Sequence, residues 1–105
     1  MKRRSLLLLS PLLLAAALPH AARAENHALT MEGMKILPAT LTVKRGDRLV
    51  WTNKDVVPHT ATAKGEFDSG AIAPGKSWSH VVSKAGTYDY VCTFHPGMKA
   101  TLVVQ

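Results

Sequence analysis

Hydrophobic and polar residues alternate over short stretches of residues 25–105. Leu49 and Trp51 share one face of an extended chain, and Tyr88, Tyr90 and Cys92 share another, because successive side chains of a strand point to opposite faces. After residue 24 no stretch has a helical repeat long enough to form a helix. The pattern predicts short β-strands at residues 28–31, 41–43, 48–52, 77–82, 87–91 and 101–104.

Turn signals rich in Gly, Pro, Asn and Asp separate these stretches. They lie at residues 44–47, 53–55, 64–66, 73–76 and 84–86. Short strands at this spacing are typical of a sandwich or barrel of antiparallel strands. We therefore expect an all-β fold, a Greek-key β-sandwich of eight strands or a similar number. Its core should include the aromatic residues Trp51, Trp78, Tyr88 and Tyr90.

The first 24 residues form a different kind of segment. A basic start is followed by an apolar stretch from Leu6 to Leu18 and then by Ala22-Arg23-Ala24, an A-x-A cleavage site. The apolar stretch is shorter than the ~20 residues of a membrane-spanning helix, which disfavours the alternative of an anchor. We expect a signal peptide at residues 1–24, exported by the general or the twin-arginine route, and one domain at residues 25–105.

Removal of the signal changes the electrostatic picture. The whole chain has 13 Lys and Arg against seven Asp and Glu, a formal net charge of +6. Four of the basic residues and none of the acidic ones lie in residues 1–24, so residues 25–105 carry nine against seven. The remaining basic residues are scattered rather than clustered in a stripe. We therefore expect no nucleic-acid partner, and no membrane association after cleavage.

A domain of this size buries only about 60–65% of the surface of its unfolded chain, less than a larger domain does, and is marginally stable without help. Small exported domains usually gain stability from disulfides, but this chain has a single cysteine, Cys92. A bound metal would occupy the thiolate and add folding free energy.

The segment from Cys92 to Met98 has the form C-x-x-H-x-x-M, directly after one predicted strand and before the last. Two His, one Cys and a weak axial Met are the ligands of blue-copper sites, and His59 in an earlier loop supplies the second imidazole. We predict one type 1 copper ion bound by His59, Cys92, His95 and Met98. A core thiol at Cys92 and an ordinary loop histidine at His59 are the alternatives.

Over residues 28–105 the chain resembles the cupredoxins, the blue-copper family, and within it the amicyanins and plastocyanins most. The ligand loop has the amicyanin spacing of two residues between successive ligands, although Thr60, Phe94 and Gly97 differ from the amicyanin pattern. The matching segments are Gly46-Asp47, Val50-Trp51-Thr52-Asn53, Pro58-His59-Thr60, Pro74-Gly75, Gly86-Thr87-Tyr88-Asp89-Tyr90-Val91-Cys92 and Cys92 to Met98.

The resemblance implies a periplasmic one-electron carrier rather than an enzyme, with copper cycling between Cu(II) and Cu(I). Cys92 would supply the strong thiolate bond, His59 and His95 the equatorial nitrogens, and Met98 the weak axial contact. Thr60 and the backbone at Thr93 would tie the two ligand loops together.

The resemblance also implies a docking surface at the copper end of a monomer. His95 would reach the surface within an apolar patch suited to a transient redox partner, either a dehydrogenase or a c-type cytochrome. The patch would include Val57, Pro58, Phe94 and Pro96.

Two other functions are compatible with parts of the sequence. A periplasmic copper carrier or resistance protein would use the same ligands, and His27, Met31 and Met34 would be candidates for a second copper, although packing in the core is the expected role of the methionines. An enzyme is disfavoured, because Cys92 and His95 share one tight loop that provides no separate base and no substrate pocket.

Overall fold

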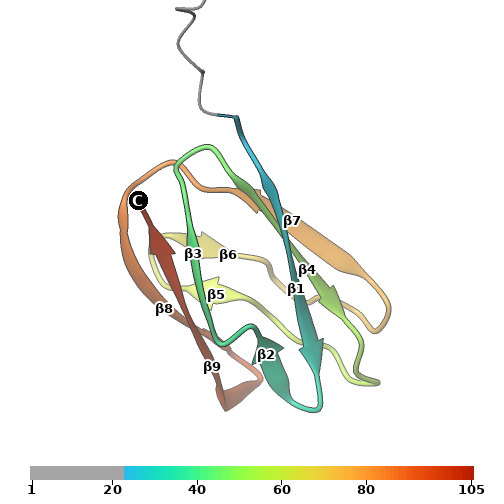
Figure 1. The fold of residues 1–105 in the computed structure, drawn as a ribbon. Helices are drawn as coiled ribbons and strands as arrows, with labels where there is room; N and C mark the ends of the chain where they lie inside the picture. Colours follow the sequence, from blue (N-terminus) through green and yellow to red (C-terminus); the bar gives the residue numbers. More distant parts are fainter. Residues whose placement is uncertain (1–22) are drawn as a thin grey trace, which may run out of the picture.

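A computed structural model describes residues 23–105 (Figure 1). These residues form nine β-strands and no helix, so they also contain no apolar helix of membrane-spanning length. Of the predicted signal peptide at residues 1–24, only Arg23 and Ala24 fall within the described range. The remainder lies outside the described residues.

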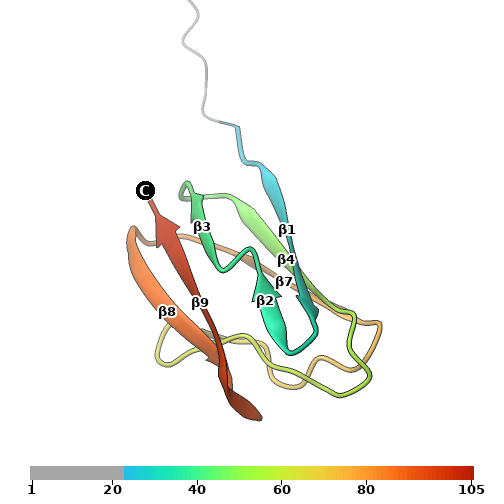
Figure 2. The ribbon, with the colours of Figure 1, turned by 60° about the horizontal axis from the view of Figure 1, so that its bottom comes forward.

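The strands form two sheets, which face each other across a common core (Figures 1 and 2). The expected all-β sandwich is therefore confirmed. The first sheet has the order β2–β1–β4–β7, with β1 at Asn26–Glu32, β2 at Lys35–Leu37, β4 at Arg48–Asn53 and β7 at Ser77–Val81. The second has the order β3–β9–β8–β5–β6, with β3 at Thr40–Val43, β9 at His95–Val104, β8 at Gly86–Cys92, β5 at Thr62–Ala63 and β6 at Phe67–Asp68.

Both sheets are mixed, and the expectation of antiparallel pairing throughout was wrong for two pairs of strands. Strand β1 runs parallel to β4, from Asn26 opposite Arg48 onward, and β3 runs parallel to β9. Turn signals report only on strands that are joined by the turn. The direction of β1 relative to β4 depends instead on how the intervening chain crosses over.

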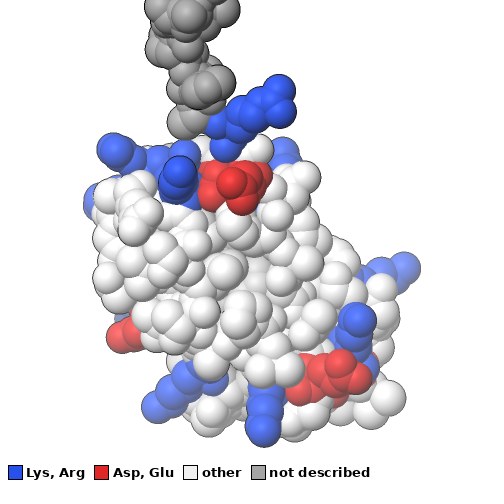
Figure 3. Space-filling model, viewed as in Figure 1, with Lys and Arg blue, Asp and Glu red and all other residues white. Residues whose placement is uncertain are grey.

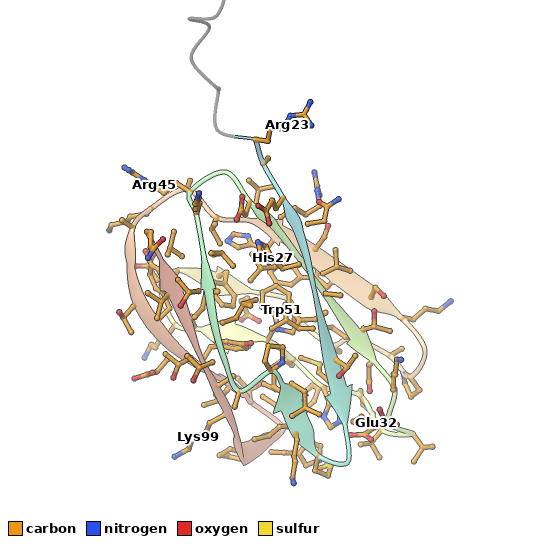
Figure 4. All side chains as sticks on the ribbon, viewed as in Figure 1. Arg23, His27, Glu32, Arg45, Trp51 and Lys99 are labelled. Atoms are coloured by element: carbon orange, nitrogen blue, oxygen red, sulfur yellow. The ribbon has the colours of Figure 1, made fainter. Side chains whose placement is uncertain are left out.

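The core follows the alternation of the sequence. Leu49 and Trp51 are completely buried, and the Trp51 Nε1–H donates a hydrogen bond of 3.1 Å to the Tyr90 hydroxyl of the other sheet. Figure 4 shows Trp51 in the middle of the sandwich. Trp78 and Tyr88 are only partly buried, but they pack against the same core. Trp51 and Tyr90 are therefore confirmed as core residues, whereas Trp78 and Tyr88 lie at the edge of the core.

Three connections lie at one end of the sandwich, the lower end in Figure 1, which Figure 2 turns forward. They are the β1–β2 turn, the loop after β4 and the β8–β9 turn. The chain enters β1 at the opposite end, where the C-terminus also lies (Figure 1). Every predicted ligand lies in or next to the loop after β4 or the β8–β9 turn.

Candidate metal centre

Cys92 and His95 face each other across a tight hairpin. They pair directly at the junction of β8 and β9, and only Thr93 and Phe94 lie between them. A register shift between Val91 and Cys92 interrupts the ladder at this point. The distance from Cys92 Sγ to His95 Nδ1 is 3.6 Å. The segment that the sequence analysis treated as a loop is thus mostly strand, because β9 already begins at His95.

His59 reaches the same place from a different part of the chain. It lies in the segment between β4 and β5 and is fixed by two backbone hydrogen bonds with Ile72, of 3.1 Å and 2.7 Å. Its side chain is fully buried, and its Nδ1 lies 3.6 Å from Cys92 Sγ. The His59 and His95 rings meet edge to face, with centroids 5.1 Å apart.

The three donor atoms have the spacing of ligands that share one ion. The ligand atoms of His59, Cys92 and His95 all lie within 4.8 Å of one another. Metal–ligand bonds of about 2.0–2.3 Å at angles of about 110–120° place sulfur and nitrogen about 3.6–3.8 Å apart. The two observed sulfur–nitrogen distances of 3.6 Å match this value. The donor set therefore fits a thiolate-binding metal in trigonal geometry.

Met98 lies three residues beyond His95, in β9. Its side chain is buried, as is that of Ala100, which shares its face of the strand. Met98 also lines a pocket of about 140 Å³, together with Met34 and Leu37 from the neighbouring β1–β2 segment. It thus lies at the same end of the sandwich as the other three candidates.

Thr60 joins the two ligand-bearing segments. Its backbone N–H donates to Cys92 Sγ at 3.3 Å, and its Oγ1 accepts a hydrogen bond of 2.9 Å from the backbone N–H of Thr93. These two hydrogen bonds fix the position of the sulfur relative to the segment that carries His59. The expected role of Thr60 and Thr93 as a link between the loops agrees with this geometry.

Asp55 was missed by the sequence analysis, which treated it only as a turn residue. Its Oδ2 accepts a hydrogen bond of 2.7 Å from His59 Nε2, the ring nitrogen that faces away from Cys92. The hydrogen bond from His59, joined by one from the backbone N–H of Met34, lowers the pKa of Asp55. A carboxylate on the outer nitrogen of a ligating histidine fixes its tautomer and orientation. In the sequence, the only indication of this contact is an acidic residue four positions before the histidine.

The same carboxylate also holds the β1–β2 turn. It accepts hydrogen bonds from the backbone N–H groups of Gly33, at 2.7 Å, and Met34, at 3.0 Å. Both residues have positive φ, 65° and 62°, as a two-residue hairpin of this twist requires. Met34 is an unusual residue in this conformation, and its half-exposed side chain lies beside the site.

The structure does not bring His27, Met31 and Met34 together as a second metal site. Met31 is completely buried in the core, and His27 Nε2 lies 2.9 Å from the carboxylate of Asp47, at the opposite end of β1 from Met34. Of the three, Met34 lines the pocket that Met98 also lines.

Several exposed apolar residues lie at the same end of the sandwich as His95, and two of them flank it in the sequence. His95 itself is partly exposed, and the four residues expected to surround it are all exposed: Val57, Pro58, Phe94 and Pro96. Val56, Met34 and Leu37 at the same end add further exposed apolar side chains. On the face in Figure 3, Lys and Arg gather at the two ends of the molecule with Asp and Glu among them, and the middle carries few charges.

Known proteins resemble this chain in sequence. Residues 5–104 match the family model of the cupredoxin-like domain. An amicyanin of Paracoccus versutus is 33% identical over 81 residues, which cover 71% of this chain and 61% of the relative. A plastocyanin of Scenedesmus fuscus is 35% identical over 96 residues, covering 78% and 93%. The match covers less than two thirds of the length of two amicyanins: 61% of the Paracoccus versutus protein and 66% of the Methylorubrum extorquens protein.

Solved structures resemble it in fold. An oxidized amicyanin variant superposes with a TM-score of 0.70 at 29% identity, covering 75% of this chain and 81% of that one. A Cu(I) amicyanin variant gives 0.71 at 29% identity, covering 76% and 82%. The family model spans nearly the whole sequence, and the two-sheet sandwich carries its candidate ligands at one end. The chain belongs to the cupredoxin family.

Proposed function

We propose that the protein is a one-electron carrier that binds a single type 1 copper ion through His59, Cys92, His95 and Met98. The observation that carries the proposal is the convergence of one thiolate and two imidazoles, from separate segments, at distances suited to one ion. Bound copper would supply the Cu(II)/Cu(I) couple. Amicyanins and plastocyanins, which this chain resembles, are electron carriers rather than enzymes.

The protein's contribution is to hold the ligands in place. His59 is locked by its backbone pairing with Ile72 and by the Asp55 carboxylate. Cys92 and His95 are held by the hairpin and by Thr60. Ligands that are fixed on this many sides rearrange little when the charge of the ion changes, and a small rearrangement permits rapid electron exchange.

We further propose that the carrier works as a monomer in the periplasm after signal removal. Its partners would be redox proteins, either a dehydrogenase or a c-type cytochrome. His95 is the only partly exposed residue of the four proposed ligands, and exposed apolar side chains lie at the same end of the sandwich. A small apolar patch of this kind suits a brief encounter rather than a permanent complex.

Copper delivery remains the rival function. Its only hint was a second soft site near the N-terminus, and Met31 and His27 are engaged elsewhere. The two functions differ in what happens on reduction. A carrier of electrons keeps its copper in both oxidation states, whereas a delivery protein hands over Cu(I).

A copper titration of the metal-free protein tests the proposal. One equivalent should produce intense thiolate-to-copper absorption, and the colour should disappear and return over repeated cycles of reduction and oxidation. The reduced protein should also keep its copper in the presence of a modest Cu(I) chelator. Saturation at another stoichiometry would contradict the single site, and rapid loss of Cu(I) to the chelator would favour delivery.

A further inference from the structure

Asp47 is a buried carboxylate far from the metal centre. It lies in the turn between β3 and β4, with only 3% of its surface exposed. Its Oδ1 accepts a hydrogen bond of 3.0 Å from the backbone N–H of Glu25, and its Oδ2 accepts one of 3.0 Å from that of Lys44. His27 Nε2 lies 2.9 Å from Oδ2. One side chain thus ties the start of β1 to the turn that precedes β4.

Glu25 is the residue at which the chain joins the domain. Among the described residues it is the first whose backbone is hydrogen-bonded, through its N–H to Asp47 and through its carbonyl to the N–H of Arg48 at 2.9 Å. Figure 4 shows Arg23 projecting away from the sheets. The predicted cleavage site, between Ala24 and Glu25, therefore coincides with the edge of the folded structure.

We infer that cleavage between Ala24 and Glu25 creates an ion pair that locks the N-terminus to Asp47. A signal peptidase adds water across this peptide bond: the hydroxyl goes to the Ala24 carbonyl carbon and the hydrogen to the Glu25 nitrogen. The amine that forms takes up a further proton at neutral pH. The atom that now lies 3.0 Å from the Asp47 carboxylate would then carry a full positive charge.

The positive charge on the Glu25 nitrogen would strengthen the hydrogen bond that this atom already makes to Asp47. A hydrogen bond between two ionised groups is shorter and roughly twice as strong as one between neutral groups. Burial of Asp47 adds to this, because a carboxylate that is shielded from water interacts more strongly with a nearby charge. The pair would also hold the first residues of β1 against β4, since Asn26 pairs with Arg48 directly beside it. Processing would thus complete the fold as well as release the protein.

Moving the amine by one residue tests the inference, which does not depend on copper binding. Two chains are compared, one that begins at Glu25 and one that retains Ala24. Each is made with the natural Asp47 and with Asp47→Asn, which gives four proteins. Both chains keep all nine strands, since β1 starts at Asn26. We expect retention of Ala24 to lower the melting temperature by about 4–8 °C with Asp47 present and to have little effect with Asn. Equal losses in both backgrounds, or no loss in either, would overturn the inference.

A second readout covers the case in which Asp47→Asn fails to fold. The mature protein is treated at neutral pH with an amine-reactive reagent, and labelling of its α-amine is followed by mass spectrometry. An amine paired with Asp47 should react several-fold more slowly than the amine of the chain that retains Ala24. Equal rates would refute the ion pair, as would an exported protein whose intact mass shows another first residue.

Discussion

The carboxylate of Asp55 lies 2.7 Å from Nε2 of His59, on the side of the ring that faces away from Cys92. This contact fixes which nitrogen of His59 carries a proton, because a carboxylate accepts a hydrogen and so leaves Nδ1 free to bind a metal. Asp55 also holds the backbone of Gly33 and Met34. The metal centre and the neighbouring β1–β2 turn therefore share one anchor.

Replacing Asp55 should weaken copper binding without abolishing it. In Asp55→Ala the His59 ring loses its orienting partner, and loss of such partners lowers metal affinity about 10–100-fold. Competition with a chelator of known affinity measures the effect. Asp89→Ala is the matched control, because that exposed carboxylate accepts its hydrogen bond from Thr101 and not from a proposed ligand. Equal affinities for the two variants would show that Asp55 has no role in the site.

Cys92→Ser should abolish the intense visible absorption of the copper-loaded protein. The absorption arises from charge transfer between the thiolate and copper, and a serine oxygen cannot provide it. The spectrum after addition of one equivalent of copper is the measurement, and circular dichroism checks that the sandwich is intact. If the colour persists in this variant, the ligand assignment is wrong.

Tyr90→Phe should destabilise the fold more than Tyr88→Phe. Loss of the Tyr90 hydroxyl leaves the buried Trp51 Nε1–H without its partner, at a cost of about 1–3 kcal/mol in unfolding free energy. The Tyr88 hydroxyl donates to the carbonyl of Lys84 at an exposed position, where water can replace it, so about 0.5–1.5 kcal/mol is expected. Denaturant titrations of both variants give the comparison, and a reversed order would contradict it.

Stability should fall as the pH rises from about 10 to about 12. Burial raises the pKa of Tyr90 to about 12 from the usual 10.0, with the hydrogen bond from Trp51 acting in the opposite direction. The folded state therefore favours the neutral phenol, a contribution that is complete below pH 10 and lost as the pH passes 12. Unfolding free energies measured over this range should decline less in Tyr90→Phe. Phenolate absorption of Tyr90 in the intact fold near pH 10 would be incompatible with its burial.

At acid pH, the fold should lose the stability that depends on the ionised carboxylate of Asp47. Hydrogen bonds from the backbone of Glu25 and Lys44, and then from His27, lower the pKa of Asp47 to about 2 from the usual 3.8. The folded state favours the carboxylate, so this stability is present above about pH 4 and is lost as the pH falls toward 2. Asp47→Asn should be less stable at neutral pH and should lose less on acidification. Parallel acid-unfolding curves for the two proteins would contradict this assignment.

The sequence alone determined the fold class and the residues that face the core. Short β-branched and aromatic stretches between turn signals can bury one face only by forming strands, so alternation placed Leu49, Trp51 and Tyr90 correctly. It also predicted the ligand types, because a C-x-x-H-x-x-M segment combines the donors that one soft metal needs. Both predictions depend on residues that are close in the chain.

The tertiary structure decided what depends on residues far apart in the chain. The parallel pairing of β1 with β4 follows from a crossover, which no local pattern specifies. The role of Asp55 and the separation of His27 from Met34 likewise depend on which ends of the strands meet. His59 and Cys92 lie 33 residues apart, yet their ligand atoms are separated by 3.6 Å. Local sequence sets the direction of each side chain along its strand, but only the packing of the two sheets sets which side chains converge.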